Sequence, residues 1–186
     1  MVRAVRRLAC GLSSRAHRAQ VLGAIRTPTI LDFAGAYDNP EAFHGGSFRG
    51  IIDQQSPADW REEVYAAHTF HEVTNYYPMR VVRQKRLKLI WNIAHPLTYS
   101  SASDLWAAAT WQGALRREVS AYGQRTVDAY LHRPRFELYD LESDPHETVN
   151  PAERPEHAAT VEQMCNKLRA FQQRTDDPWL HKWEYE

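Results

Sequence analysis

The side chains best suited to chemistry lie in "HTFHE", residues 68–72. His68, His71 and Glu72 could together hold a metal ion if they shared a face. The stretch is typical of a strand that runs into a loop, and a strand points residues i and i+3 to opposite faces. We therefore expect no metal site here, with His68 packed within the sheet and His71 and Glu72 at its rim. A rim position is where a binding pocket could recruit these last two side chains.

A basic stretch, "MRVVRQKRLK", occupies residues 79–88. Most of its cations are expected to form the solvated face of a hairpin. Such a hairpin could also attract sulfated or phosphorylated ligands. Arg80 follows Pro78 and Met79 at the start of a strand, and it therefore has the best claim to a pocket role.

No catalytic centre is indicated by the remaining candidates. Asp176 and Asp177 precede Pro178 and are predicted to be turn residues, not a general acid/base pair. Cys10 and Cys165 lack the spacing of zinc ligands or of a disulfide framework. Since no nucleophile, base and orienting group come together, we predict no catalytic residue, no metal ligand and no cofactor within this chain.

Composition narrows the class of protein. The chain has 186 residues, of which 43% are hydrophobic and 25% charged, which is ordinary for a globular domain. Lys plus Arg and Asp plus Glu both number 23, so the chain as a whole is not a polyanion binder and no nucleic-acid partner is expected. No apolar run approaches the roughly 20 residues of a membrane helix, so no membrane partner is expected either.

The amino-terminal region differs in charge from the rest. No Asp or Glu precedes Asp32, and residues 1–24 form a basic leader that is predicted to be disordered or a mis-start of the reading frame. A transit peptide is the alternative, whereas a secretory signal is not indicated because no apolar segment follows the arginines. The sequence therefore assigns no cellular compartment to the protein. Residues 25–60 are predicted to be a connecting helix and loop, and residues 61–186 the main subdomain.

Periodicity predicts the elements of this subdomain. "RLKLIWN" alternates apolar and basic residues, which favours a hairpin, and apolar residues recur at helical spacing near the carboxyl end. The predicted strands are 61–70, 78–83, 86–92 and 135–141, and the predicted helices are 27–36, 103–118 (capped by Ser103) and 155–175. The fold class is α+β: a small antiparallel sheet of about four strands with a long C-terminal helix packed on it. If the unit evolved within a larger protein, it should also expose an apolar patch.

One stretch carries a family resemblance. "ELYDLESDPHETVN", residues 137–150, resembles the C-terminal signature of the sulfatases of the alkaline-phosphatase-like superfamily. "HEVTNYYPMRVVRQKRLKLIWN" (71–92) and "TDDPWL" (175–180) are similar to the sulfamidase branch of that family. The resemblance covers roughly residues 25–180. Asp144, Pro145 and Asn150 suit a break that stops a strand and turns the chain into the terminal helix.

The resemblance implies that the catalytic groups belong to a different domain from the one encoded here. Sulfatases hydrolyse sulfate esters or sulfamates with a formylglycine and a calcium ion, both held by an N-terminal catalytic domain to which no residues here correspond. "CGLSSR" (10–15) lacks the proline of the formylglycine signature and places Arg15 one residue too far. The resemblance thus implies a C-terminal subdomain, inactive alone, whose partners are that catalytic domain and sulfated sugars. His71, Glu72 and Arg80 are its candidates for one wall of the substrate pocket.

Two alternatives remain open from the sequence. The chain could be a stand-alone, non-catalytic module that binds sulfated glycans or a partner core domain. It could also be half of a split enzyme that a separately encoded core completes.

Overall fold

The computed structural model describes residues 23–54, 61–71 and 75–185 of the chain. It divides into two compact units, residues 1–64 and residues 65–186. The predicted boundary after residue 60 stays a prediction. Most of the basic leader, including Cys10 and the "CGLSSR" stretch, lies outside the described residues, and so does Glu72.

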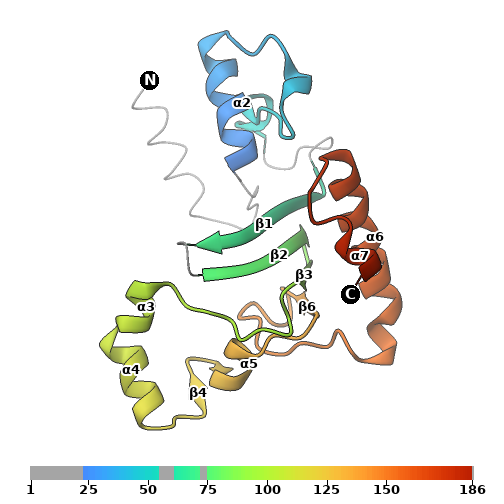
Figure 1. The fold of residues 1–186 in the computed structure, drawn as a ribbon. Helices are drawn as coiled ribbons and strands as arrows, with labels where there is room; N and C mark the ends of the chain where they lie inside the picture. The colour runs from blue at the N-terminus through green and yellow to red at the C-terminus, as the bar shows by residue number, and fades with distance from the viewer. Residues whose placement is uncertain (1–22, 55–60, 72–74, 186) are drawn as a thin grey trace. The chain divides into compact units, whose positions relative to one another are not determined.

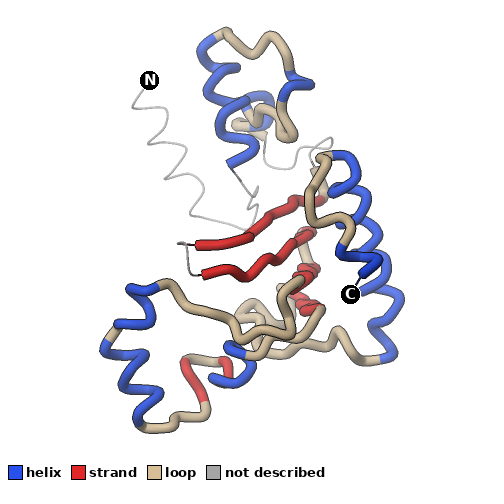
Figure 2. The backbone as a smooth tube through the Cα atoms, in the orientation of Figure 1, coloured by secondary structure: helices blue, strands red, loops and turns tan. Residues whose placement is uncertain are grey.

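A four-stranded antiparallel sheet forms the centre of the second unit, as predicted. Its strands are β1 (Glu63–His71), β2 (Asn75–Gln84), β3 (Leu87–Asn92) and β6 (Phe136–Asp140), in the spatial order β1-β2-β3-β6. The register pairs Val82 of β2 with Leu89 of β3, and Leu89 with Leu138 of β6. Figure 1 shows the long helix α6 (Ala158–Arg174) beside this sheet, and Figure 2 shows the same helix in blue next to the red strands.

Strand alternation explains why α6 packs where it does. Successive side chains of a strand point to opposite faces, so Leu89 and Trp91 of β3 share one face with Val82 and Leu138. This face meets Met164 and Leu168 of α6 in the hydrophobic core. Each of these six side chains is at most 2% exposed. Fully burying one large aliphatic side chain contributes about 1.5–3 kcal/mol, and this core therefore holds the helix against the sheet.

The carboxyl-terminal segment closes over the same core. The ring of Trp183, in α7 (Lys182–Tyr185), stacks on Trp91 at a centroid distance of 3.8 Å. Its indole Nε1 donates to Oε1 of the buried Gln172 in α6 at 2.7 Å. A stacked aromatic pair adds about 0.5–1.5 kcal/mol beyond its buried area, so the last residues contribute to the stability of the helix–sheet packing.

Single residues of the segment between β3 and β6 contact the sheet face opposite α6, through Tyr99 on Tyr77 and through Arg125 and Arg133 at Glu137. The segment contains α3 (Ser103–Ala107), α4 (Ala109–Arg116), a small β4–β5 hairpin (Ala121–Tyr122 and Arg125–Thr126) and α5 (Val127–Leu131). A chain of edge-to-face aromatic contacts runs from Tyr77 of β2 through Tyr99 and Tyr130 to Trp111 of α4.

Both ends of this segment meet at Asn92. The Asn92 backbone N–H donates to the carbonyl oxygen of Arg135 at 2.9 Å, and its side-chain Nδ2 donates to the carbonyl oxygen of Pro134 at 2.8 Å. The chain therefore leaves the sheet and returns to it at adjoining points.

The predicted helix 103–118 was wrong in its continuity. Ala108 has an extended backbone (φ −59°, ψ 130°) and separates α3 from α4. The carbonyl of Trp106, close to this break, accepts a hydrogen bond from Gln112 Nε2 at 2.8 Å. The N-cap of α3 is Ala102, with no side-chain cap bond, so the predicted cap by Ser103 was also wrong. The β4–β5 hairpin was not predicted.

The first unit contains α2 (Gly23–Ala34) and the short 3₁₀ helices η1 (Pro40–Ala42) and η2 (Arg49–Ile51). Helix α2 begins one turn earlier than predicted, so Pro28 lies inside it and Thr27 does not cap it. The helix ends at Ala34, two residues before the end of the predicted range, because Gly35 adopts φ +71°, a conformation that glycine reaches without steric cost.

Candidate functional site

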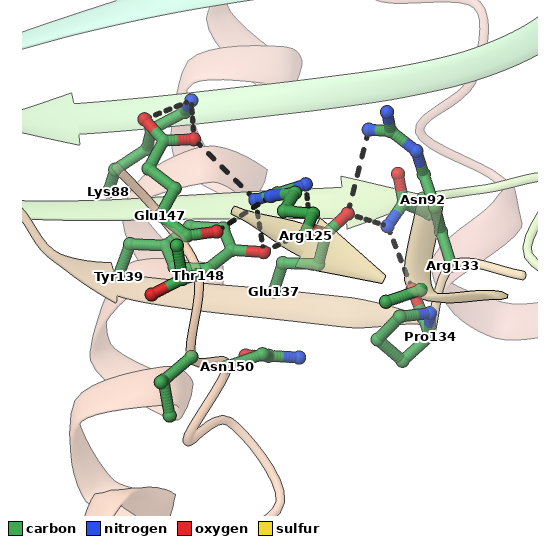
Figure 3. Close-up of polar contacts among 12 residues, drawn as sticks. Lys88, Asn92, Arg125, Arg133, Pro134, Glu137, Tyr139, Glu147, Thr148 and Asn150 are labelled. Atoms are coloured by element: carbon green, nitrogen blue, oxygen red, sulfur yellow. Dashed lines mark hydrogen bonds and ion pairs between the residues drawn. The ribbon is translucent and has the colours of Figure 1, made fainter. Parts of the chain in front are cut away.

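A polar network lies on the sheet face opposite α6, with the Glu137 carboxylate at its centre (Figure 3). Alternation places Glu137 and Tyr139 of β6 on this face, together with Lys88 and Asn92 of β3. Asn92 Nδ2 donates to Glu137 Oε1 at 2.7 Å, and the Tyr139 hydroxyl donates to Glu137 Oε2. The Glu137 side chain is only 3% exposed. A buried carboxylate costs free energy unless it is hydrogen-bonded and paired, and these contacts provide part of that compensation.

Two arginines approach Glu137 from the segment that follows β3. Arg125 Nη1 lies 3.7 Å from Glu137 Oε2, and Arg133 Nη1 lies 3.8 Å from Oε1. Arg125 also donates from Nη2 to the Tyr139 hydroxyl at 2.7 Å and from Nε to the carbonyl of Glu147 at 2.7 Å. The network therefore fixes the β4–β5 hairpin to the sheet and to the turn that follows β6.

Lys88 extends the network toward that turn. Its Nζ donates to both carboxylate oxygens of Glu147, at 2.9 and 2.8 Å. Most cations of the basic hairpin were expected to be solvated. The Lys88 side chain is only 20% exposed, whereas that of Arg86 is 62% exposed and pairs with Asp140 at 2.6 Å.

The turn after β6 is built by side-chain to backbone hydrogen bonds. Asp144 Oδ2 accepts from the N–H groups of Thr148 and Val149 at 2.6 and 2.9 Å. Asn150 Oδ1 accepts from the N–H of Leu138 at 2.8 Å and from that of Ala152 at 3.1 Å, while its Nδ2 donates to the carbonyl of Phe136 at 2.9 Å. The order Asp-Pro, Glu, Asn thus ends the strand and joins the turn back to it.

Arg80 lies on the other face of the sheet, the face that α6 covers. Its Nε and Nη2 donate to the two carboxylate oxygens of Asp177 at 2.6 and 2.9 Å. Its Nη1 donates to the carbonyls of His68 and Met79 at 3.2 and 3.0 Å. The two charged side chains are only 6% and 11% exposed, so Arg80 ties the end of the chain to β2.

Asp177 combines this ion pair with the turn role predicted for it. Its N–H donates to the carbonyl of Gln172 at 3.0 Å, and its Oδ1 accepts from the N–H of Trp179 at 2.9 Å. Burial works to raise the pKa of Asp177, but the hydrogen bonds from Arg80 and Trp179 and the charge of Arg80 outweigh it and lower the pKa. The carboxylate therefore stays ionised beside Arg80.

The histidines of β1 are placed as a strand predicts. His68 and His71 both belong to β1, three residues apart, so their side chains point to opposite faces. His71 is exposed at the end of the strand and His68 is partly buried. Desolvation lowers the pKa of His68, and the neighbouring charges of His71 and Arg133 lower it further. Substrate contact by His71, Glu72 or Arg80 stays a prediction.

Three side chains, Tyr77, Tyr139 and Cys165, have raised pKa values and stay protonated at neutral pH. Burial raises the pKa of Tyr77 to about 12, even though Arg133 opposes the shift. Burial and the adjacent Glu137 carboxylate raise the pKa of Tyr139 well above its usual value. Burial raises the pKa of the Cys165 thiol to about 11. At neutral pH these groups serve as hydrogen-bond donors or apolar packing, not as nucleophiles.

Within the described ranges, no group of three or more His, Cys, Asp or Glu side chains is arranged to hold a metal ion. None of the helices described is long and apolar enough to cross a membrane.

Two features of these sites escaped the sequence analysis. Arg80 and Asp177 are 97 residues apart, so no local pattern links them. Glu137 was visible as a polar residue in the alternating strand "FELYD", where its parity with Tyr139 places it on the face opposite Leu138. That alternation was the available signal for a polar face.

Comparison with known proteins gives one family match. Residues 9–105 match the model of the family described as "N-sulphoglucosamine sulphohydrolase, C-terminal". N-sulphoglucosamine sulphohydrolase of Homo sapiens is 32% identical over 164 residues, an alignment that covers 83% of this chain and 32% of the human protein. The ulvan-active sulfatase of Formosa agariphila is 27% identical over 152 residues, covering 81% of this chain and 28% of that protein. The chain thus spans about a third of the length of these curated relatives.

Solved structures share the fold. One protein, solved in complex with its substrate D-glucosamine-2-N,6-O-disulfate, aligns with a TM-score of 0.51 at 21% identity, over 81% of this chain and 23% of its own. A 2-O GAG sulfatase aligns with a TM-score of 0.53 at 18% identity, over 83% of this chain and 25% of its own.

Proposed function

Because the chain belongs to the N-sulphoglucosamine sulphohydrolase C-terminal family, we propose that it is the C-terminal subdomain of a sulfatase or sulfamidase. The reaction is hydrolysis of sulfate esters or N-sulfo groups of sulfated sugars. The subdomain supplies a wall of the substrate pocket and no catalytic group, so the chain alone is inactive.

The observation that carries this proposal is the part of the relatives that the chain covers. The family match is to their C-terminal portion, and the alignments cover 32% and 28% of the two curated relatives. The names of these relatives support a substrate that bears sulfo groups on a sugar. The remaining two thirds of such a protein would hold the formylglycine and the calcium ion expected for sulfatases, and would be the principal partner of this chain.

The candidates for the pocket wall belong to strands β1 and β2 or follow β1 directly in the sequence. His71 is exposed at the end of β1 and can reach a sugar directly, and Glu72 follows it in the sequence. Arg80 already uses its guanidinium on Asp177 and on two backbone carbonyls. We therefore assign it a positioning role, in which it fixes the carboxyl-terminal turn beside the wall.

Complementation tests this proposal. The chain would be co-expressed with the catalytic portion of the human relative that it does not match, and sulfate release from glucosamine N-sulfate would be measured. We expect release only when both parts are present, and none from the chain alone or from the catalytic portion alone. Turnover by the purified chain by itself would refute the proposal.

A His71→Ala variant tests the wall within the same assay. Loss of a contact to the sugar should raise KM for glucosamine N-sulfate, and His132→Ala, which changes an exposed histidine of α5's carboxyl end, serves as the matched control. Equal KM values for the two variants would remove His71 from the wall.

A further inference from the structure

Arg133 is a mostly buried arginine without a hydrogen bond in the described part of the chain. Its side chain is 12% exposed, and its Nε is buried without a partner. The guanidinium lies over the ring of Tyr99, 4.1 Å from the centroid, and 5.6 Å from that of Tyr130. Its nearest carboxylate oxygen, Glu137 Oε1, is 3.8 Å from Nη1, a distance too long for a hydrogen bond.

This arrangement differs from that of Arg80 in β2. Arg80, with 6% of its side chain exposed, makes four hydrogen bonds to Asp177 and to two carbonyls. Arg133 carries the same five N–H donors, and its Nε is buried without an acceptor. A donor withdrawn from water without a new acceptor loses stability, so a guanidinium in this state has unused capacity for an acceptor.

Glu137 does not fill that capacity. Its nearest oxygen lies 3.8 Å from Arg133 Nη1, and its two oxygens accept hydrogen bonds from Asn92 Nδ2 and from the Tyr139 hydroxyl. The ion pairs that link the network join the cations Lys88, Arg125 and Arg133 to the carboxylates of Glu137 and Glu147, three positive charges against two negative. The linked groups therefore carry one positive charge in excess.

Two polar side-chain atoms of β1 and β2 also lack partners. The Tyr77 hydroxyl and His68 Nε2 are buried and make no hydrogen bond. The Tyr77 ring meets the edge of Tyr99, with centroids 4.9 Å apart, so Arg133 and Tyr77 contact the same ring.

We propose that Arg133, whose guanidinium lies on the Tyr99 ring that Tyr77 also contacts, binds an oxyanion of the substrate, namely a sulfo group of a sulfated sugar. The planar guanidinium presents two parallel N–H donors that match two oxygens of such a group, and stacking on Tyr99 holds the fork in place. The partly exposed edge of the side chain gives the ligand access. The ligand class rests on the proposed function, whereas the binding residue adds to the wall candidates named above.

Titration of the full chain with glucosamine N-sulfate at low salt tests this site. The Arg133 Nε–Hε resonance is followed by ¹H–¹⁵N NMR, with N-acetylglucosamine as the uncharged control and glucuronate as a carboxylate. We expect a saturable shift of this resonance with glucosamine N-sulfate and none with N-acetylglucosamine. A shift with glucuronate but not with the sulfated sugar would overturn the assignment to a sulfo group.

Variants then distinguish specific binding by the Arg133 guanidinium from a non-specific effect of positive charge. Arg133→Gln should weaken binding of glucosamine N-sulfate at least about tenfold, which corresponds to about 1.4 kcal/mol, and Arg133→Lys should recover only part of it. Arg154→Gln removes the same charge from an exposed side chain and should change the Kd less than about twofold, because an exposed charge is screened by water and salt. Equal weakening in both glutamine variants would refute the proposal.

Two readouts keep the outcomes distinct. Circular dichroism establishes that Arg133→Gln is folded, and the resonance of the unaltered chain reports binding without any substitution. Binding without sulfate release in the complementation assay would leave the Arg133 site standing and remove the proposed function. Release with an unshifted Arg133 resonance would do the reverse.

Discussion

The buried ion pair between Arg80 and Asp177 predicts a large loss of stability in an Asp177→Asn variant. The substitution keeps the shape of the side chain and removes its charge. Arg80 would then stay buried, with 6% of its side chain exposed, opposite a neutral amide. Removing one partner of a buried pair typically costs about 3–5 kcal/mol, because the remaining charge is uncompensated.

The structure places the expected value at the lower end of that range. The Asn oxygen can still accept one hydrogen bond from Arg80, and two carbonyls continue to accept from Nη1. We therefore expect a decrease of about 3 kcal/mol in the free energy of unfolding. With an m-value of about 1–3 kcal/mol/M in urea, the unfolding midpoint should fall by about 1–3 M.

Urea unfolding followed by tryptophan fluorescence measures this change. Asp176→Asn is the matched control, since Asp176 is exposed and has φ +49°, a conformation that Asn also tolerates. It should change the free energy of unfolding by less than about 0.5 kcal/mol. A double variant, Arg80→Met with Asp177→Asn, should be more stable than Asp177→Asn alone, because it removes the uncompensated charge. If the two Asn variants unfold at the same urea concentration, the ion pair does not hold the end of the chain to β2.

Three further outcomes are expected. A hydrogen bond from Arg86 is the main cause that lowers the pKa of Asp140 from 3.8 to about 2. The ionised Asp140 therefore stabilises the folded chain above the unfolded pKa, and this stabilisation is lost as the pH falls toward the folded pKa. An Asp140→Asn variant should accordingly lose less stability than the unaltered chain between pH 4 and pH 2, measured as the urea midpoint at each pH. Asn150→Ala removes three hydrogen bonds to the backbone and should cost about 3 kcal/mol at about 1 kcal/mol each, whereas Asn166→Ala on the exposed face of α6 should cost nothing, by thermal unfolding. In a Cys10→Ser background, Cys165 should react slowly with a thiol reagent at pH 8 and rapidly once the chain is unfolded, because burial raises its pKa to about 11.

Much of the sheet could be predicted from the sequence because its signals are local. The alternation of Leu87, Leu89 and Trp91 with polar residues identified the central hairpin, and the recurrence of Val161, Met164 and Leu168 identified α6. The helix at 103–118 was overextended, since helical spacing alone gives no sign that Ala108 turns to an extended conformation. Short elements such as β4 and β5, of two residues each, carry too little periodicity to be detected.

The candidate sites were harder to predict because they depend on contacts between distant segments. Arg80 was identified as unusual from its position after Pro78, but its partner Asp177 lies 97 residues away. Arg133 was not singled out at all, because its lack of hydrogen bonds is a property of the folded chain and not of its neighbours in sequence. The resemblance to sulfatases was sufficient to predict the family, which the comparison confirmed.

The way the chain leaves and re-enters the sheet at Asn92 has a consequence for engineering. Strands β3 and β6 are direct neighbours, and the carbonyls of Pro134 and Arg135 meet Asn92 at the junction. The segment between these points could therefore have another length without rethreading the sheet, provided that it again supplies cations to the buried Glu137 carboxylate, as Arg125 and Arg133 do. This junction is a natural point for loop grafting, where substrate preference could be altered while the scaffold is kept.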